Sequence, residues 1–350
     1  MTHTDKQKHF DKKPKIAIVG PLLGIHNGKA VSQGEFLGIK LEEEGYSVLY
    51  ISRKIKKIAR LIDTIKQLLF KKKQYDIIIL QGMGWQHKYM ELITYILSRI
   101  LRKRLIYTMH GGSLHNEYKS SMIYKFLFNR IKTITVPSEY FFELFRKKGI
   151  KTEIIYNQIT LNNYIFTERY QINPSLLWMR TFHIDYNPLM AIKVVQVLKD
   201  EFPNIKLYMG GANGKYFDFI KNYIENHQLE NIVHLIGYLD VDKKNEYSKK
   251  CDFYLCTNTY DNTPVSMIEM MAMGLIIIST NVGGIPYMIK NNENGILVKN
   301  DDHLEMAEAI KKLLYDNETS KEISKNARKS IEKFDWEKSI KHKWLTILNN

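Results

Sequence analysis

Short apolar runs alternate with longer amphipathic stretches along the first half of the chain. Five β-branched runs have the length of strands, at residues 15–20, 47–52, 76–80, 104–109 and 133–137. Stretches with the apolar spacing of helices separate them, for instance at 31–45, 55–72 and 88–102. This alternation is typical of βαβ units and predicts a parallel sheet with helices on both faces.

The same pattern begins again in the second half. Five further strand-length runs lie at 175–180, 205–210, 232–237, 252–256 and 275–280. A chain of 350 residues is also long for one hydrophobic core. We therefore predict an α/β fold with two doubly wound, Rossmann-like domains joined near 157–172. The expected parts are a disordered extension at 1–14, a first domain at 15–170, a second at 171–335 and a terminal helix at 336–350.

Composition and cysteine usage indicate the cellular compartment of the protein. No apolar stretch reaches the roughly 18 residues that a membrane-spanning helix needs. The first residues, MTHTDKQKHFDKKPK, are polar, so they do not read as a secretory signal. Cys251 and Cys256 lie in the apolar segment CDFYLC, which favours buried thiols over a zinc site. These features predict a cytoplasmic protein.

Charge is distributed unevenly between the two halves. Residues 1–170 hold 30 Lys and Arg against 14 Asp and Glu, a net charge of +16, whereas the rest holds 22 against 23. Such asymmetry indicates a polyanionic partner beside the first half, either nucleic acid or anionic lipid. The alternative is a set of lysine-rich, solvated helices with no partner. Nucleic acid would favour aromatics interleaved with basic residues, whereas the tyrosines here lie mostly in apolar runs, so we expect no nucleic-acid partner.

Residues 53–73 combine apolar and basic positions at helical spacing. The apolar positions are Ile55, Ile58, Leu61, Ile62, Ile65 and Leu69, and lysines surround them. The pattern fits an interfacial helix that would hold the protein peripherally on an anionic inner membrane leaflet. An ordinary surface helix packed on the sheet explains the apolar stripe equally well.

Ligands of such sheets bind beyond the carboxyl ends of the strands, so the loops there are the candidate sites. The loop GPLLGIHNGKAVSQGE is glycine-rich, yet Leu23 and Ala30 break both nucleotide-binding fingerprints. His110 opens the loop HGGSLHNEY, whose glycine pair would let a ligand approach the backbone. A lone histidine at a strand end also serves structure, so both interpretations of His110 stay open.

The segment YDNTPVSMIEMMAMG, residues 260–274, carries the strongest chemical signal. Thr263 suits an N-cap and Pro264 the first helical position, so a helix is expected to begin at 264. Its first amides have no intrahelical partner and can bind an anion; they belong to Val265, Ser266 and Met267. Asp261 and Glu269 flank them, which suits the diphosphate, ribose and sugar hydroxyls of a sugar nucleotide. Alternatively, the two acids only favour the helix dipole.

This segment resembles the E-x7-E segment of the retaining glycosyltransferases of family four (glycosyl transferases group 1), which have the GT-B fold. Other segments resemble that family in the same order along nearly the whole chain. They are GYSV, TMHGG, TVPSEYFFELFRKKG, IYNQI, LLWMR, GGANG, HLIGYL, NVGGIPYMI and FDWEKSIKHKW. The resemblance implies two Rossmann-like domains with a cleft between them and a C-terminal helix that crosses back to the first.

The resemblance also implies roles for individual residues. Arg180 would clamp the diphosphate, Glu269 would hold the ribose hydroxyls, and Asp261 would contact the transferred sugar. The amides of residues 265–267 would bind the leaving phosphates, and His110 would lie near the sugar and the acceptor. Further donor-binding positions are Gly211, Gly237 and Tyr238, in the loops around the base, and acceptor-side positions are Gly28 and Lys29.

The implied reaction is transfer of a sugar, with retention, from a nucleotide-sugar to a glycan or lipid-linked acceptor in cell-surface polysaccharide biosynthesis. No metal or other cofactor is expected, because the D-x-D of Asp240 and Asp242 fits a helix start. The chain departs from the family at Asp261 (usually Glu), at Pro264 (usually Gly) and in RTFHIDYNP, which lacks the expected lysine. A GT-B sugar-nucleotide epimerase, an inactive relative and a nucleic-acid-binding protein are therefore the alternative interpretations.

Overall fold

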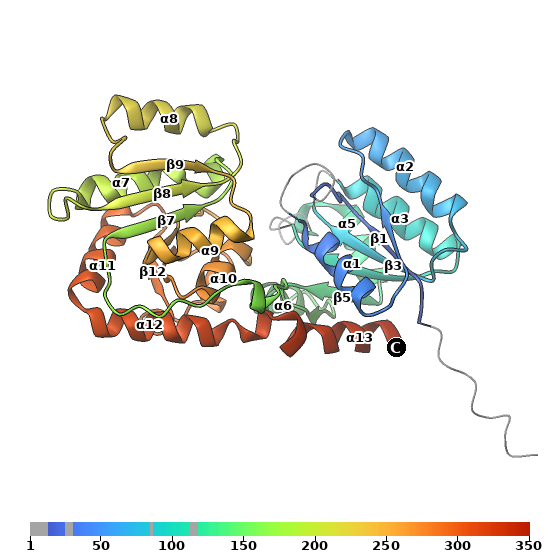
Figure 1. Ribbon diagram of the computed structural model, residues 1–350. Coiled ribbons are helices and arrows are strands. Elements are labelled where there is room, and N and C mark those ends of the chain that lie inside the picture. The colour runs from blue at the N-terminus through green and yellow to red at the C-terminus, as the bar shows by residue number, and fades with distance from the viewer. Residues whose placement is uncertain (1–12, 25–30, 85–86, 112–117) are drawn as a thin grey trace, which may run out of the picture. The chain divides into compact units, whose positions relative to one another are not determined.

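The computed structural model describes residues 13–24, 31–84, 87–111 and 118–350. The chain divides into two compact units (Figure 1). The first unit comprises the residues up to 137, 141–158 and 342–350, and the second comprises 138–140 and 159–341. The main chain therefore passes from one unit to the other after residue 158, within the segment 157–172. Each unit is built on one parallel sheet of six strands.

The sheet of the first unit has the strand order β2-β1-β3-β4-β5-β6. Its strands are β1 (Ile16–Val19), β2 (Val48–Ile51), β3 (Ile77–Gly82), β4 (Arg104–Met109), β5 (Thr133–Val136) and β6 (Glu153–Ile154). The strands β1 and β3 lie inside the sheet and are buried on both faces, which explains the continuous apolar residues at 16–19 and 77–80. Five of the six coincide with the predicted runs, and the edge strand β6 was not predicted.

The sheet of the second unit has the order β12-β11-β10-β7-β8-β9. Its strands are β7 (Ser175–Met179), β8 (Lys206–Gly210), β9 (Val233–Gly237), β10 (Phe253–Cys256), β11 (Ile276–Thr280) and β12 (Ile296–Val298). The order reverses between β10 and β7, so the chain is doubly wound as predicted. Cys251 and Cys256 are buried free thiols, also as predicted.

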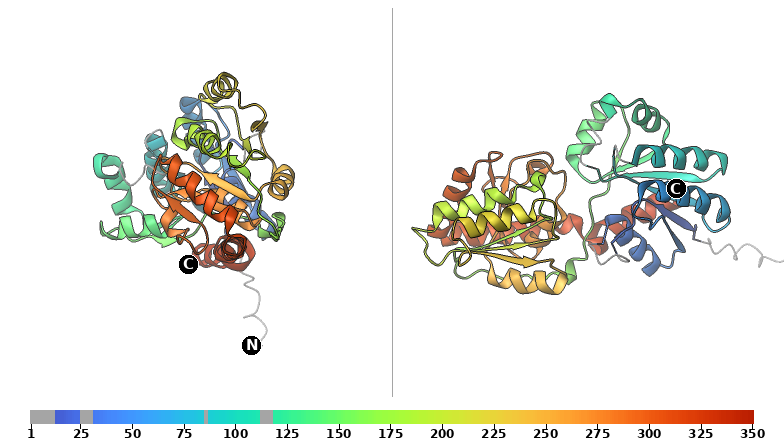
Figure 2. Two further views of the ribbon diagram at one scale, coloured as in Figure 1. Left: turned by 90° about the vertical axis from the view of Figure 1, so that its left-hand side faces the viewer. Right: turned by 90° about the horizontal axis from the view of Figure 1, so that it is seen from above.

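Helices cover both faces of each sheet (Figures 1 and 2). In the first unit they are α1 (Gln33–Glu43), α2 (Lys57–Phe70), α3 (Lys88–Ile100), α5 (Met122–Arg130), α6 (Glu139–Arg146) and α13 (Lys341–Asn349). In the second they are α7 (Pro188–Leu198), α8 (Phe217–Asn226), α9 (Val241–Lys250), α10 (Val265–Ala272), α11 (His303–Tyr315) and α12 (Asn317–Ser330). None of the helices in the described part of the chain has the length and apolarity to span a bilayer.

The last helix, α13, packs on the sheet of the first unit. Arg104, the first residue of β4, donates hydrogen bonds from its guanidinium to the carbonyls of Ile347 and Leu348. Lys343 donates from Nζ to the carbonyl of Ile154 in β6 at 3.2 Å. The side chain of Trp344 is buried beneath these contacts. The C-terminal residues thus complete the first unit, although the chain reaches them through the second.

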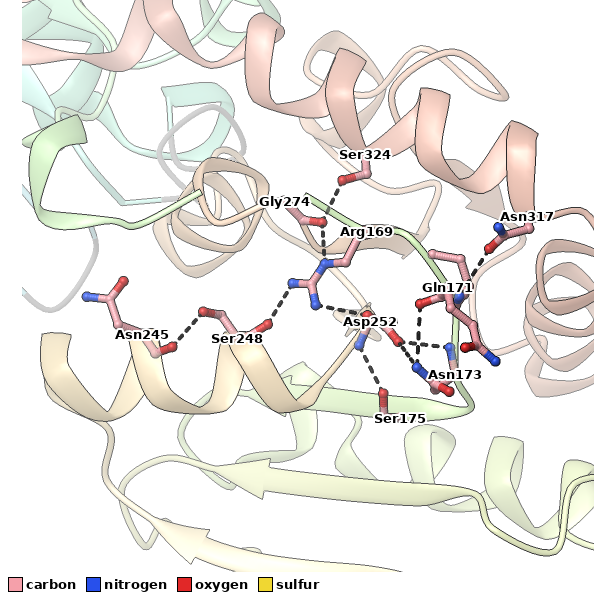
Figure 3. Close-up of polar contacts among 11 residues, drawn as sticks. Arg169, Gln171, Asn173, Ser175, Asn245, Ser248, Asp252, Gly274, Asn317 and Ser324 are labelled. Carbon is pink, nitrogen blue, oxygen red and sulfur yellow. Dashed lines mark hydrogen bonds and ion pairs between the residues drawn. The ribbon is translucent and has the colours of Figure 1, made fainter. Parts of the chain in front are cut away.

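The segment that enters the second unit is fixed there by a buried ion pair, drawn in Figure 3. Arg169 places Nη1 2.8 Å from Asp252, and both side chains are almost fully buried. Its Nη2 and Nε donate to the carbonyls of Ser248, at 2.6 Å, and Gly274, at 3.2 Å. A second oxygen of Asp252 accepts from the backbone of Asn173 at 2.8 Å. Because every group of this pair is hydrogen-bonded, the segment has one defined path across the unit.

Candidate active site

The carboxyl edge of the second sheet presents the start of α10, the segment with the strongest chemical signal. The helix begins at Val265 with Pro264 as its N-cap, one residue later than predicted. The carbonyl of Pro264 accepts from the amides of Met267 at 3.1 Å and Ile268 at 3.3 Å. The Met267 amide is therefore used inside the helix, contrary to the prediction. Within the described residues the amides of Val265 and Ser266 have no acceptor, so these two can bind an anion.

Glu269, on the second turn of α10, is buried and held from two sides. Tyr164 donates its hydroxyl to Oε1 at 2.7 Å, and Lys244 of α9 places Nζ 2.8 Å from the carboxylate. Burial and the neighbouring Glu269 carboxylate raise the pKa of Tyr164, so its hydroxyl stays protonated and donates. A carboxylate has about four acceptor positions, so Glu269 can still accept hydrogen bonds from ligand hydroxyls. Sequence reasoning found Glu269 but neither of its partners.

Arg180 and Asp261 meet at the same edge. Arg180 follows β7, and its Nη2 donates to Oδ2 of Asp261, which also accepts from Asn258 Nδ2 at 2.7 Å. The guanidinium lies 4.7 Å from the ring centroid of Tyr186, a cation–π contact. Among the described residues the buried Nε of Arg180 has no hydrogen-bond partner, so it remains available to an anion. The two residues predicted to hold different parts of a donor thus contact each other.

A glycine pair brings a neighbouring loop against Asp261. Gly284 donates its amide to the carbonyl of Asp261 at 2.9 Å. Gly283 has a φ of +54°, and a Cβ there would lie 2.0 Å from the same carbonyl oxygen. Only glycine permits this approach, because an L side chain would collide with the backbone and strain the left-handed conformation. The NVGG loop therefore positions Asp261 through its main chain.

The predicted base-side positions also gather near Arg180. Gly211 donates its amide to the carbonyl of Gly237 at 2.7 Å. A Cβ on Gly211 would lie 1.8 Å from the carbonyl oxygen of Arg180, so the loops after β7, β8 and β9 touch at their backbones. Tyr238, the next residue, is exposed. The structure thus places Gly211 and Gly237 beside Arg180 and leaves the Tyr238 ring open to a ligand.

His110 lies at the end of β4 in the first unit. Its amide donates to the carbonyl of Gly82 at 2.8 Å. Burial lowers the pKa of His110 to about 4, so the imidazole is neutral near pH 7. Within the described residues Nε2 has no partner and is available to a ligand. The other acceptor-side predictions, Gly28 and Lys29, lie outside the residues that the structure describes.

A row of buried polar side chains near His110 was not predicted from the sequence. Gln81, Thr108 and Thr135 are in register across β3, β4 and β5, near the carboxyl ends of the strands. In the described part of the chain, the Gln81 amide group and both threonine hydroxyls have no hydrogen-bond partner. Unsatisfied buried polar groups are rare and call for an explanation such as a ligand. The signal in the sequence was the polar residue that interrupts each apolar run near its end.

The D-x-D motif caps a helix. Asp240 is the N-cap of α9 and accepts from the amide of Lys243 at 2.9 Å, as the sequence predicted. Among the described residues, no three His, Cys, Asp or Glu side chains form a group that could hold a metal ion.

Two six-stranded parallel α/β units with a C-terminal helix that returns to the first define a GT-B glycosyltransferase architecture. Residues 169–330 match the model of the family described as glycosyl transferases group 1. Residues 169–330 are therefore a domain of this family, and the chain is a glycosyltransferase of EC class 2.4, which transfers a sugar from a nucleotide-sugar.

Individual relatives agree with this assignment. An uncharacterized glycosyltransferase of Methanocaldococcus jannaschii is 23% identical, over 76% of this chain and 75% of its own length. A poly(ribitol-phosphate) α-N-acetylglucosaminyltransferase of Staphylococcus aureus is 30% identical, over 46% of this chain and 32% of its own length. The crystal structure of Anabaena HepE in complex with UDP superposes with a TM-score of 0.74 at 16% identity, covering 97% of this chain and 100% of HepE.

Proposed function

We propose that this enzyme transfers a sugar, with retention of anomeric configuration, from a UDP-sugar to a hydroxyl of a glycan or lipid-linked acceptor in cell-surface polysaccharide biosynthesis. The observation that carries the proposal is the group of residues at the start of α10. Arg180 contacts Asp261 just before the helix, Glu269 follows on its second turn, and the amides of Val265 and Ser266 have no acceptor among the described residues. HepE is similar over its full length and has been crystallised with UDP and with UDP-glucose. These complexes support a uridine nucleotide as the donor.

The proposed donor site uses groups that are chemically matched to a nucleoside diphosphate. Arg180 donates from Nε to the diphosphate, and the amides of Val265 and Ser266 bind phosphate oxygens at the positive end of the helix dipole. Glu269, oriented by Lys244 and Tyr164, accepts hydrogen bonds from the ribose hydroxyls. Because Asp261 accepts from Nη2, Arg180 can bind the diphosphate through Nε while it keeps Asp261 beside the sugar.

The proposed chemistry proceeds on one face of the sugar. The bond between the anomeric carbon and the diphosphate oxygen breaks, and the ring carries positive charge that the Asp261 carboxylate stabilises. The acceptor oxygen forms the new bond on the face that the diphosphate leaves. Its proton passes to the departing phosphate oxygen, so no protein base is required. This sequence of events retains the anomeric configuration.

On the acceptor side we propose a ligand rich in hydroxyl groups. Gln81, Thr108 and Thr135 offer buried donors and acceptors without partners among the described residues, and neutral His110 offers its Nε2. The relative from Staphylococcus aureus acts on poly(ribitol-phosphate), a polymer of this kind. A lipid-linked acceptor would place the enzyme peripherally at the inner membrane leaflet.

The test is a panel of nucleotide-sugars presented to the purified protein. UDP-sugars should raise the melting temperature and release UDP, and the product made with a polyol acceptor should show a retained anomeric configuration by proton NMR. Turnover should survive EDTA, because Asp240 caps a helix. The variant Asp261→Asn should lose turnover, whereas the exposed Asp242→Asn should match the wild type. An inverted product, or activity restored only by a divalent cation, would contradict the proposal.

A further inference from the structure

The helix α2 carries its apolar side chains outward. Ile58 is 76% exposed and Phe70 is 85% exposed, and Ile62 and Leu69 are exposed as well. The inner side of the helix instead bears Arg60, Thr64 and Leu68. At 3.6 residues per turn Ile58, Ile62 and Leu69 form one stripe, nearly opposite the buried residues. Of the two interpretations of residues 53–73, packing of this stripe on the sheet is therefore excluded.

Local hydrogen bonds allow a charged side chain to occupy the inner side of α2. Arg60 is only 4% exposed, and its Nε and Nη2 donate to the carbonyls of Lys54 at 2.7 Å and Ile55 at 2.8 Å. These two carbonyls lie six and five residues before Arg60, so the segment that leads into α2 satisfies the buried guanidinium and allows it to face inward. The outward stripe is thus a feature of the fold.

The apolar surface continues onto the neighbouring helices. The helix α2 packs beside α3, and α3 packs beside α5. The exposed apolar side chains of these two helices are Tyr89, Ile96, Ile100, Met122 and Phe126. Exposed contiguous apolar surface on a protein with charged surroundings marks an interaction site.

A cationic pocket opens at the C-terminal ends of α3 and α5. Its volume is about 600 Å³, and its basic lining residues are Arg99, Arg102, Lys103, Arg104, Arg130 and Lys132. No acidic side chain occurs among the described residues that line it. Arg104 donates to carbonyls of α13 and Lys103 donates to the carbonyl of Tyr75. The other four basic side chains still exceed the one or two charges that would satisfy the helix dipoles. Ile96 and Ile100 share α3 with Arg99, and Arg130 lies over the ring of Phe126, so apolar and cationic groups adjoin.

We propose that the first unit binds an anionic lipid bilayer through the outward side chains of α2, α3 and α5, with a lipid phosphate in the cationic pocket. The apolar side chains enter the interfacial region and the basic ones pair with headgroups. A second copy of this chain would bring two strongly positive surfaces together, which disfavours self-association through this face. Nucleic acid would leave the exposed isoleucines without a role. The inference deepens the peripheral position proposed above and rests on it.

Vesicle co-sedimentation tests the proposal without reference to turnover, so its failure leaves the transferase reaction untouched. The full-length protein should sediment with phosphatidylglycerol-containing vesicles and not with phosphatidylcholine alone, and salt should weaken the binding. Ile58→Ser combined with Ile62→Ser should lower vesicle affinity at least about 10-fold. Leu304→Ser, an exposed apolar residue of α11, is the matched control and should bind as the wild type does.

The pocket has its own pair of variants. Arg99→Gln combined with Arg130→Gln should weaken vesicle binding about 10- to 30-fold, since each basic residue near an anionic surface contributes about five-fold. Lys249→Gln combined with Lys329→Gln removes the same charge from exposed positions of the second unit and should have little effect. Both pocket variants alter exposed side chains, so the melting temperature should stay at the wild-type value. Three results would overturn the proposal. The first is equal binding to neutral and anionic vesicles, and the second is a wild-type dimer in light scattering that the Ile58 and Ile62 variant loses. The third is tighter binding to single-stranded DNA than to vesicles.

Discussion

Lys244 places its ammonium group 2.8 Å from the carboxylate of Glu269, and the side chains are only 16% and 8% exposed. The pair joins α9 to α10 inside the second unit. It holds the proposed ribose-binding carboxylate in one orientation while Tyr164 donates to the same group. A pair this well buried adds little net stability compared with apolar packing, but loss of one partner leaves an uncompensated charge. The pair therefore links the stability of the unit to the geometry of its candidate donor site.

Replacement of Lys244 should damage both properties at once. We expect Lys244→Met to lower the free energy of unfolding by about 2–3 kcal/mol, toward the lower end for buried pairs because Lys244 keeps some exposure. The donor KM should rise roughly 10-fold, because the Glu269 carboxylate loses the ammonium group that orients it. Urea denaturation and initial rates of UDP release measure the two effects.

The neighbouring lysine supplies the control for this substitution. Lys243 is exposed and uses only its backbone amide in the Asp240 cap, so Lys243→Met should leave both quantities unchanged. Should Lys244→Met lose stability but keep the wild-type donor KM, the pair would be structural and Glu269 would not depend on it.

The two acids of the site should respond differently to neutral substitution. Glu269→Gln should lower kcat/KM about 10- to 100-fold, mainly through the donor KM, because a hydrogen bond to a charged acceptor contributes about 1.5–3 kcal/mol. Asp261→Asn should lower kcat instead, since its charge is needed where positive charge develops. It should leave the donor KM near the wild-type value, because Arg180 can bind the diphosphate through Nε in both proteins. If both variants unfold and the folded fraction keeps normal kinetics, the acids serve only the helix.

Most of the fold could be predicted from the sequence because buried parallel strands have nearly continuous apolar sequences. The two strands that were missed, β6 (Glu153–Ile154) and β12 (Ile296–Val298), are short edge strands of two and three residues, too brief for any periodicity. The start of α10 was misplaced by one residue, since Thr263 and Pro264 both suit a helix start and local preference cannot rank them.

The candidate site was less accessible to sequence reasoning. Arg180, Asp261 and Glu269 lie in recognisable segments, whereas Lys244 and Tyr164 are 25 and 105 positions from Glu269 and lie in no motif. Their contacts arise only when α9 and the segment after residue 158 pack on the second sheet. Likewise, the apolar stripe of α2 predicted a face but not the direction in which it points, because nothing in the pattern shows that Arg60 and Thr64 occupy the buried side.

Glu91 should make stability depend on pH near neutrality. This carboxyl group of α3 is fully buried, and burial raises its pKa to about 7 although Tyr107 donates to it at 2.5 Å and the Met83 amide at 3.0 Å. The unfolded chain releases this proton near pH 4.5. Between these values the folded state binds more protons, so the stability contributed by Glu91 falls as pH rises, by about 3 kcal/mol in total.

The Glu91→Gln variant isolates this effect. The free energy of unfolding of this variant, relative to that of the wild type, should increase steadily from pH 4.5 to pH 7. Urea denaturation at each pH measures this difference. Asp242→Asn removes an exposed carboxylate, and its free energy of unfolding should differ from that of the wild type by a constant amount over the same pH range. A constant difference between Glu91→Gln and wild type across that range would show that Glu91 does not titrate there.

His110 should act in the opposite direction, on the acid side. Burial lowers its pKa from 6.5 to about 4, so the folded state keeps the imidazole neutral at pH values where the unfolded chain takes up a proton. The stability contributed by neutral His110 is therefore present above pH 6.5 and is lost by about 3 kcal/mol as the pH falls to 4. His110→Gln should remove this acid loss and, if Nε2 contacts substrate as proposed, should also lower kcat/KM. Because the imidazole stays neutral well below pH 6.5, kcat/KM of the wild type should not change around pH 6.5 through titration of His110. A wild-type limb at that pH that disappears in His110→Gln would mean that the imidazole titrates normally and acts as a proton carrier.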